Sequence, residues 1–216
     1  MNFNSLYFDL DDTLYPASSG LWDAIRQRMN EYMQRLIDLP ITEIVRLRQD
    51  YLEKYGTTLR GLQAHYDVDV DEYLDFVHDL SLNKYIQPDP DLRMLLLSLP
   101  QRRWIFTNSD ANHANRVLNI LGINDCFEGI IDIRAIEFAC KPDKIAYQRA
   151  MAVAADDDPT QCVIFDDALR NLSPARELGF FTVLVGKNGL ELSVDRTISS
   201  LHELRDRIPE LWKNND

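Results

Sequence analysis

Positively charged residues are scarce in this chain of 216 residues, because 23 Lys and Arg stand against 35 Asp and Glu and leave a formal net charge of −12. A protein that binds a nucleic acid polymer needs a basic stripe that displaces counterions from the phosphate backbone. The charge balance disfavours this class of partner, and we expect no nucleic acid polymer. It allows a small phosphorylated metabolite, provided that a bound cation offsets the acidic side chains locally.

Long apolar runs are absent as well. No stretch approaches the roughly 20 apolar residues that a helix needs to cross a bilayer. Residues 1–4 (Met-Asn-Phe-Asn) lack the basic start and the long apolar run of a secretory signal peptide. We therefore expect a cytoplasmic protein without a membrane partner.

Cysteine is sparse, and its three copies are Cys126, Cys140 and Cys162. They are widely spaced, form no Cys-x-x-Cys pair and have no pair of histidines nearby. This pattern favours reduced, mostly buried thiols over disulfides or a zinc site.

An apolar and aromatic run at residues 6–8 (Leu-Tyr-Phe) ends abruptly in acidic residues, with Asp9 and Asp11 two positions apart. Such a run predicts a buried strand over residues 5–9 that delivers carboxylates to a crevice. If the extended backbone continues through Leu10, both carboxylates leave on the same face, one placed to attack and the other to move a proton. Taken alone, a turn with helix-capping acids explains the same residues equally well.

Residues 20–85 show helical periodicity and no strand pattern. A first helix is predicted from apolar residues at spacings of three and four: Leu21, Ile25, Met29, Tyr32 and Leu36. It ends at Pro40. A second helix is capped by Thr42 and ends near Gly56, and a third begins after Asp69.

From residue 89 onward the pattern changes to alternating strands and helices. Strands are predicted at 103–107, 129–133, 161–166 and 181–185. Helices are predicted between them at 111–121, 143–155 and 171–178. Runs such as residues 163–165 (Val-Ile-Phe) are continuously apolar, as strands covered on both faces require. A doubly wound parallel sheet follows.

The sequence therefore predicts an α/β fold with two domains. Residues 1–15 and 87–216 form the core, and residues 16–86 form a helical cap inserted after the first strand. A last helix that docks on the core is predicted from Ser200, with an apolar stripe made of Leu201, Leu204, Ile208 and Leu211.

Polar side chains follow the predicted strands at their carboxyl ends, which is where a parallel α/β sheet binds its ligands. They are Asp9 and Asp11 after the first strand, Thr107 and Asn108 after the second, Asp166 and Asp167 after the fourth, and Lys141 before the helix that leads into the fourth. Four carboxylates at one edge would repel one another unless a cation and an anion lay among them. A divalent metal and a phosphate complete the electrostatics.

These residues closely resemble, in their order, the four motifs of the haloacid dehalogenase (HAD) superfamily. The motifs are Asp9-x-Asp11-x-Thr13, Thr107-Asn108, Lys141-Pro142-Asp143 and Asp166-Asp167. The superfamily consists mostly of Mg²⁺-dependent phosphatases with a Rossmann-like core, and the resemblance covers residues 3–186. One departure is Ala168, where the family often has Ser or Thr, and this weakens support for the metal without removing a ligand.

The resemblance implies a role for each motif residue. Asp9 is the nucleophile that forms an aspartyl-phosphate, and Asp11 protonates the leaving oxygen and then activates water. The resemblance implies Mg²⁺ as the cofactor, with Asp166 as a direct or an outer ligand; its ligands are Asp9, Asp11 through the backbone carbonyl, Asp166 and Asp167. The phosphoryl oxygens are bound by Thr107, Asn108 and Lys141.

Further segments look like the pyrimidine 5′-nucleotidase subfamily, which implies a pyrimidine nucleoside monophosphate such as UMP or CMP as the substrate. The segments are residues 6–16, 18–20, 55–61, 107–110, 113–114, 116–118 and 125–129. One alternative is a HAD phosphatase or phosphomutase for sugar phosphates or another small metabolite. An alternative of another class is a non-catalytic binding or regulatory module, against which the complete set of motif residues speaks.

Residues outside the motifs are weaker candidates. Arg60 in the cap is a candidate for contact with the substrate, and a solvated surface arginine explains it as well. Tyr15 lies where the chain leaves the core and is a candidate for shaping the pocket. Asn171 supports the acidic loop or caps a helix. For His113, capping or a surface position is the simpler interpretation.

Overall fold

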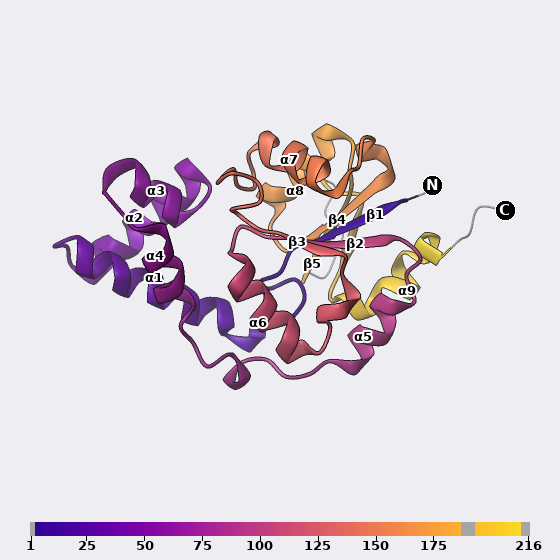
Figure 1. The fold of residues 1–216 in the computed structure, drawn as a ribbon, viewed down its shortest axis with the longest axis horizontal. Coiled ribbons are helices and arrows are strands. Elements are labelled where there is room, and N and C mark those ends of the chain that lie inside the picture. The colour runs from indigo at the N-terminus through magenta and orange to yellow at the C-terminus, as the bar shows by residue number, and fades with distance from the viewer. Residues whose placement is uncertain (1–2, 187–192, 213–216) are drawn as a thin grey trace. The chain divides into compact units, whose positions relative to one another are not determined.

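The computed structural model describes residues 3–186 and 193–212. It divides the chain into two compact units, one formed by Met1–Ser19 with Ile86–Asp216 and the other by Gly20–Tyr85. We call the first the core unit and the second the cap unit. Figure 1 shows that the core unit contains the sheet and that the cap unit is built from helices.

The strands in the described part of the core unit form one parallel sheet in the order β3-β2-β1-β4-β5-β6. They are β1 (Ser5–Phe8), β2 (Arg102–Phe106), β3 (Gly129–Ile131), β4 (Cys162–Asp166), β5 (Phe181–Val185) and β6 (Arg196–Ile198). Phe8 at the end of β1 is level with Ile105 of β2 and Phe165 of β4. The carboxyl ends of these three strands therefore reach the same edge of the sheet. The predicted doubly wound parallel sheet is confirmed.

The edge strand β6 is absent from the prediction. It is short and begins with the exposed Arg196, so it lacks the continuous apolar run that marks the buried strands. Asp195, directly before β6, is held against β5. Its carboxylate accepts hydrogen bonds from the backbone N–H and from the hydroxyl of Thr182, both at 2.8 Å. This pairing of a threonine with a distant aspartate leaves no pattern in the sequence.

Helices cover both faces of the sheet, with α7 and α8 on one face and α5, α6 and α9 on the other (Figure 1). Their bounds are α5 (Pro90–Leu97), α6 (Ala111–Leu121), α7 (Lys144–Ala154), α8 (Leu169–Leu178) and α9 (Leu204–Arg207). Asp89 caps α5, since its side chain accepts from the backbone N–H of Leu92 at 2.9 Å. Under α7 and α8, the rings of Tyr7, Phe106 and Tyr147 pack edge to face.

The last predicted helix is broken into pieces. Helix α9 has four residues and lies between 3-10 turns at Leu201–Glu203 and Pro209–Trp212. Further 3-10 turns lie at Ala17–Ser19, Leu82–Lys84, Asn124–Cys126 and Pro159–Gln161. Pro209 explains one break, because proline cannot donate to a continuing helix. The predicted apolar stripe is buried all the same, from Leu201 to Leu211.

Four helices make up the described cap unit: α1 (Leu21–Leu36), α2 (Ile41–Tyr55), α3 (Thr58–His65) and α4 (Val70–His78). Asp69 caps α4 as predicted, through bonds from the backbone N–H groups of the first turn. The predicted cap at Thr42 is wrong, because α2 begins one residue earlier, directly after Pro40. Helix α3 was not predicted, although Thr57 caps it.

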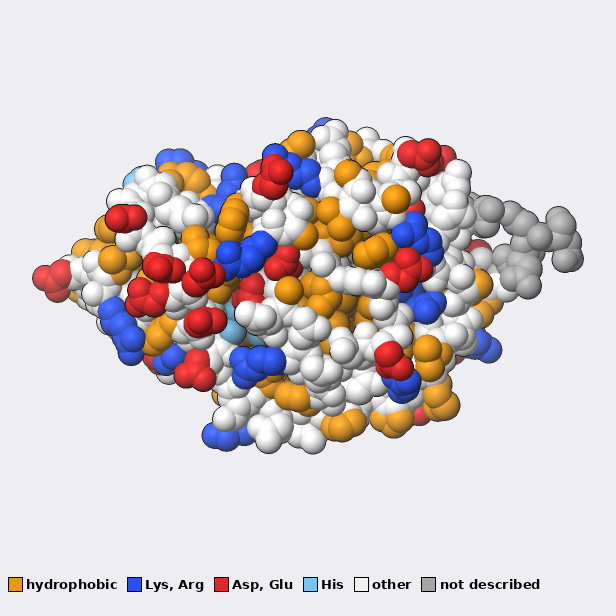
Figure 2. Space-filling model, in the orientation of Figure 1, with side chains coloured by type: hydrophobic (Ala, Val, Ile, Leu, Met, Phe, Trp, Pro, Cys, Tyr) orange, Lys and Arg blue, Asp and Glu red, His pale blue; other side chains and the backbone are white. Residues whose placement is uncertain are grey.

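The predictions about cysteine, positive charge and membrane-spanning helices can be compared with the structure. The three cysteines are buried and none of them forms a disulfide, as expected. On the face drawn in Figure 2, Lys and Arg side chains lie in small groups interspersed with acidic ones. Within residues 3–186 and 193–212, no helix combines the length and the apolar character that crossing a bilayer requires.

The close packing of α3 on α2 depends on Gly61. A Cβ atom at this position would overlap Cβ and Cγ of Tyr51, which is 6% exposed in the core of the cap unit. We expect Gly61→Ala to lower the free energy of unfolding by about 1–3 kcal/mol, because neither helix can move apart without opening that core. Gln63→Ala, at an exposed position of the same helix, is the control. Chemical unfolding followed by circular dichroism measures both, and equal stability of the two variants would contradict the packing argument.

Candidate active site

The residues predicted for catalysis lie at the carboxyl edge of the sheet. The backbone N–H of Asp9 donates to the carbonyl of Phe165 at 2.9 Å, which extends the pairing of β1 with β4 by one residue. Asp166 is the last residue of β4. Thr107 directly follows β2 and donates its backbone N–H to Ile131 at 3.1 Å. Regular strand pairing thus positions these side chains.

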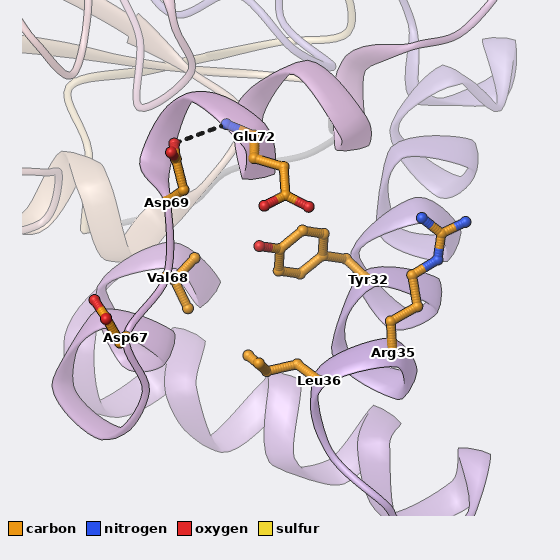
Figure 3. Close-up of a pocket in the computed structure, with 7 residues that line it drawn as sticks. All are labelled: Tyr32, Arg35, Leu36, Asp67, Val68, Asp69 and Glu72. Carbon is orange, nitrogen blue, oxygen red and sulfur yellow. Dashed lines mark hydrogen bonds between the residues drawn. The ribbon is translucent and has the colours of Figure 1, made fainter.

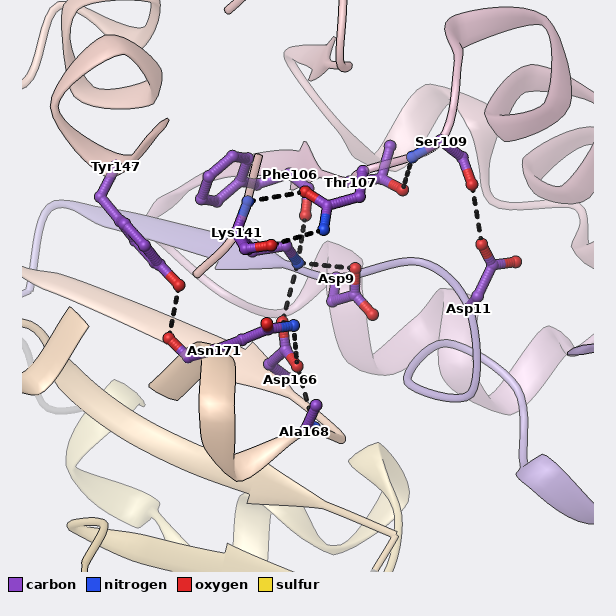
Figure 4. Close-up of polar contacts among 11 residues, drawn as sticks. Asp9, Asp11, Phe106, Thr107, Ser109, Lys141, Tyr147, Asp166, Ala168 and Asn171 are labelled. Atoms are coloured by element: carbon purple, nitrogen blue, oxygen red, sulfur yellow. Dashed lines mark hydrogen bonds and ion pairs between the residues drawn. The ribbon is translucent and has the colours of Figure 1, made fainter. Parts of the chain in front are cut away.

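Lys141 joins the ends of three strands (Figure 4). Its Nζ is 2.7 Å from Oδ1 of Asp9, 2.7 Å from Oδ2 of Asp166 and 2.9 Å from the carbonyl of Phe106. The side chain is 1% exposed, and the three contacts match the three hydrogens of an ammonium group. Burial by itself would lower the pKa of Lys141, but the charges of Asp166 and Asp9 reverse this and hold the pKa above its usual value. Lys141 is therefore charged.

Both oxygens of Asp166 are occupied by donors. Oδ1 accepts from the backbone N–H of Ala168 and from Nδ2 of Asn171, each at 2.9 Å, while Oδ2 accepts from Lys141 and, at 3.1 Å, from Asn171. Asn171 thus supports the acidic loop, one of the two roles expected of it. Its own backbone carbonyl accepts from the phenol of Tyr147.

Three side chains contact the carboxylate of Asp11. Oδ1 is 2.5 Å from the phenol oxygen of Tyr15 and 3.0 Å from Nε2 of His113, and Oδ2 is 3.1 Å from the hydroxyl of Ser109. Burial, followed by the charge of Asp11, raises the pKa of Tyr15 well above its usual value, so its phenol stays protonated and donates. Tyr15 was a predicted candidate, and it contacts Asp11 directly.

The surface position considered for His113 is wrong, because this residue is 1% exposed. The sequence did contain a signal for it. Asp110 stands three residues earlier, at the spacing of a helix cap, and its side chain accepts from the backbone N–H of His113 at 3.0 Å. This cap places His113 in the first turn after β2. Ser109 was missed because nothing in the sequence sets one serine of this turn apart.

The side chain of Asn108 holds the segment that carries Lys141. Its Nδ2 donates to the backbone carbonyl of Lys141 at 2.9 Å, and its Oδ1 accepts from the backbone N–H of Lys141 at 2.8 Å. Thr107 accepts from the backbone N–H of Ser109 at 3.0 Å through its hydroxyl oxygen. The hydroxyl hydrogen of Thr107 is not used in this bond.

The carboxylates at this edge fit a cation. One oxygen each from Asp9, Asp166 and Asp167 lie within 4.8 Å of one another. Burial raises the pKa of Asp9 well above its usual value, with Lys141 opposing the shift and the other two carboxylates adding to it. Burial also raises the pKa of Asp167 to about 7, helped by the charges of Asp166 and Asp12. Hard oxygen donors with an excess of negative charge suit a divalent cation such as Mg²⁺.

Arg60 belongs to the cap unit, where it is half-buried in the first turn of α3 and donates its backbone N–H to Thr57 at 3.2 Å. Its contact with a substrate stays a prediction.

The cap unit also contains a pocket of about 530 Å³ between α1 and the start of α4 (Figure 3). It is lined by Tyr32, Arg35, Leu36, Asp67, Val68, Asp69 and Glu72. Three carboxylates stand against one guanidinium, and this charge disfavours a phosphorylated ligand. We therefore do not assign the substrate to this pocket.

The parallel sheet and its acidic edge define an α/β protein of the HAD type. A family model described as haloacid dehalogenase-like hydrolase matches residues 4–179, and the chain belongs to this family. The helical cap inserted after the first strand is consistent with solved HAD structures.

A curated relative is phosphate metabolism protein 8 of Saccharomyces cerevisiae, which is 33% identical over 192 residues. The alignment covers 82% of this chain and 60% of the yeast protein, so the chain spans less than two thirds of that relative's length.

Solved structures share the fold. A HAD phosphatase from Thermococcus onnurineus is 20% identical with a TM-score of 0.64, and the match covers 94% of this chain and 97% of that one. A HAD-hydrolase from Bacillus subtilis, bound to magnesium, is 17% identical with a TM-score of 0.62, covering 95% and 98%.

The raised pKa of Asp167 predicts a pH-dependent stability. The unfolded chain releases this proton near pH ~4 and the folded chain near pH 7. Between these values the folded state binds more protons, so the free energy of unfolding of the metal-free protein falls as the pH rises, by about 1–3 kcal/mol. Mg²⁺ favours the ionised form and should stabilise the protein more at pH 8 than at pH 5.

Urea unfolding at both pH values, with Mg²⁺ and with EDTA, measures this difference. Asp167→Asn keeps the shape of the side chain without the charge, and it should lose the part of the pH-dependent fall that comes from Asp167 and most of the response to Mg²⁺. An equal response to Mg²⁺ at pH 5 and pH 8 would count against a cation at these carboxylates.

Proposed function

We propose that this protein is a Mg²⁺-dependent phosphomonoester hydrolase that works through an aspartyl-phosphate on Asp9, with pyrimidine nucleoside monophosphates as substrates. The observation that carries the proposal is the pair Asp9 and Asp11. One carboxylate lies in the acidic cluster beside Lys141, and the other, two residues later, contacts three side chains outside that cluster. One position suits a nucleophile and the other suits proton transfer.

The reaction proceeds in two steps. In the first, an oxygen of Asp9 attacks phosphorus, the bond from phosphorus to the ester oxygen breaks, and Asp11 gives its proton to the departing oxygen. In the second, Asp11 takes a proton from a water molecule that attacks phosphorus, which releases inorganic phosphate and restores Asp9. Because Oδ1 of Asp9 is bonded to Lys141, we expect attack through Oδ2.

The proposed cation is held by Asp9, Asp167 and the backbone carbonyl of Asp11. Asp166 is proposed as an outer ligand, because donors already occupy both of its oxygens. When bound, Mg²⁺ would screen the negative charge of Asp9 from that of the phosphate. The charge excess at this edge and the directions of the pKa shifts support this assignment.

Phosphoryl oxygens are proposed to bind at Thr107, Asn108 and Lys141. The hydroxyl of Thr107 has a hydrogen to donate, and the amide of Asn108 has a second one. Lys141 already contacts three acceptors, so it contributes its charge and shares its donors as the transition state forms.

Support for the pyrimidine substrate comes from the sequence segments that look like the pyrimidine 5′-nucleotidases, Tyr55–Gly61 among them. The name of the yeast relative, a phosphate metabolism protein, agrees with a phosphorylated substrate. A phosphatase for sugar phosphates or a phosphomutase shares the same edge chemistry, and a substrate panel separates these functions.

Asp9→Asn should abolish phosphate release, by at least about 1,000-fold in kcat, because an amide is a poor nucleophile. EDTA should abolish the activity of the unmodified protein, and Mg²⁺ should restore it. Asp91→Asn, an exposed position of α5, is the matched control and should keep full activity. Normal turnover by Asp9→Asn would refute the mechanism.

The substrate proposal is tested by kcat/KM on UMP, CMP, AMP, GMP and hexose phosphates with Mg²⁺ present. We expect values for UMP and CMP at least about 10-fold above the others, as a base-recognising pocket would produce. Equal values across the panel would reject pyrimidine specificity and leave the phosphatase. No hydrolysis of any compound would favour the non-catalytic module.

A further inference from the structure

A buried histidine contacts the residue to which we assign proton transfer. Nε2 of His113 lies 3.0 Å from Oδ1 of Asp11, and the imidazole ring is 0% exposed. Asp11 moves both protons of the proposed reaction. A general acid and base must be held within hydrogen-bond reach of the atoms it serves, so the orientation of Asp11 is a requirement of the chemistry.

The fold leaves the His113 ring little freedom. Asp110 caps helix α6 and fixes the backbone of His113 in the first turn. The neighbouring Ala114 and, one turn later, Val117 are 0% exposed, so this end of α6 is packed into the core unit. A rigid ring on a capped and buried turn presents its nitrogen at a constant position.

The two oxygens of Asp11 differ in their partners. Oδ1 contacts two side chains, the phenol of Tyr15 at 2.5 Å and the imidazole of His113 at 3.0 Å. Oδ2 has the hydroxyl of Ser109 at 3.1 Å, and a hydroxyl rotates and also accepts hydrogen bonds. The contact at Oδ2 therefore survives when this oxygen carries a proton, because Ser109 can then accept.

We infer that His113 is a positioning residue: its Nε2–H holds Oδ1 of Asp11, so that Oδ2 gives the proton to the departing oxygen and takes the next one from water. This inference rests on the proposed phosphatase function. His113 itself gains and loses no proton in this cycle. It acts only through the direction in which it holds the carboxylate.

Two substitutions separate this role from a role in folding. His113→Gln can place an amide N–H close to the position of Nε2, whereas His113→Met has a similar volume and cannot donate. On the phosphate ester of the panel that the unmodified protein hydrolyses fastest, we expect His113→Met to lower kcat about 10- to 100-fold and to change KM less than about 3-fold. His113→Gln should recover most of kcat. Asn115→Ala, an exposed position on the same helix, is the control.

p-Nitrophenyl phosphate tests which steps depend on His113. Nitrophenolate leaves as a stable anion and needs no proton, so the first step should proceed in His113→Met. The second step needs Asp11 as the base and should slow. We expect a burst of one nitrophenolate per protein molecule, followed by slow release. Similar rates of both steps in His113→Met and the unmodified protein would overturn the inference.

The Asp11→Asn background supplies the decisive comparison. If His113 acts through Asp11, adding His113→Met to Asp11→Asn should leave kcat unchanged, whereas a purely structural role predicts a further 10- to 100-fold fall.

Nitrogen NMR of the His113 imidazole provides a readout that does not depend on activity, and it should show the hydrogen on Nε2. A hydrogen on Nδ1 alone would contradict the inference. Absence of phosphatase activity in the unmodified protein would instead refute the proposed function.

Discussion

The buried ammonium group of Lys141 is the contact on which the arrangement of the edge depends. It bonds to Asp9 after β1, to the carbonyl of Phe106 at the end of β2 and to Asp166 at the end of β4. Without it, two carboxylates would face each other away from water, which is among the most costly arrangements in a protein interior. Asn108 in turn holds the backbone of Lys141 in both directions. A single cation thus ties together three adjacent strands.

The second constraint is that one lysine does not balance the negative charge around it. Asp9, Asp166 and Asp167 share a small volume, and the pKa values of Asp9 and Asp167 are raised by burial and by their neighbours. The folded chain therefore stores electrostatic repulsion at the place where we propose that phosphate chemistry occurs. A bound cation would relieve this repulsion, so the proposed ion would contribute both to the stability of the protein and to its proposed activity.

The strand ends could be predicted because an apolar run that stops at a carboxylate is visible in one dimension, as at Asp9 and Asp166. Contacts between distant segments could not be predicted from the sequence. The pairing of Thr182 with Asp195 that precedes β6 leaves no periodic pattern. Helix α3 was not predicted because its first residues belong to a polar stretch of the sequence, and only the packing on Tyr51 explains the glycine at position 61.

Of the three side chains that contact Asp11, only Tyr15 was predicted to belong to the pocket. Tyr15 was a candidate because it lies where the chain leaves the core, whereas Ser109 and His113 come from a turn about a hundred residues after Asp11. The spacing of Asp110 and His113 is explained by a helix cap alone, so it does not indicate where the imidazole ring of His113 points.

The cap unit has a hydrophobic core of its own, between Gly20 and Tyr85, and contributes no strand to the sheet. Substitutions within this separate core therefore leave the strand register of the sheet undisturbed.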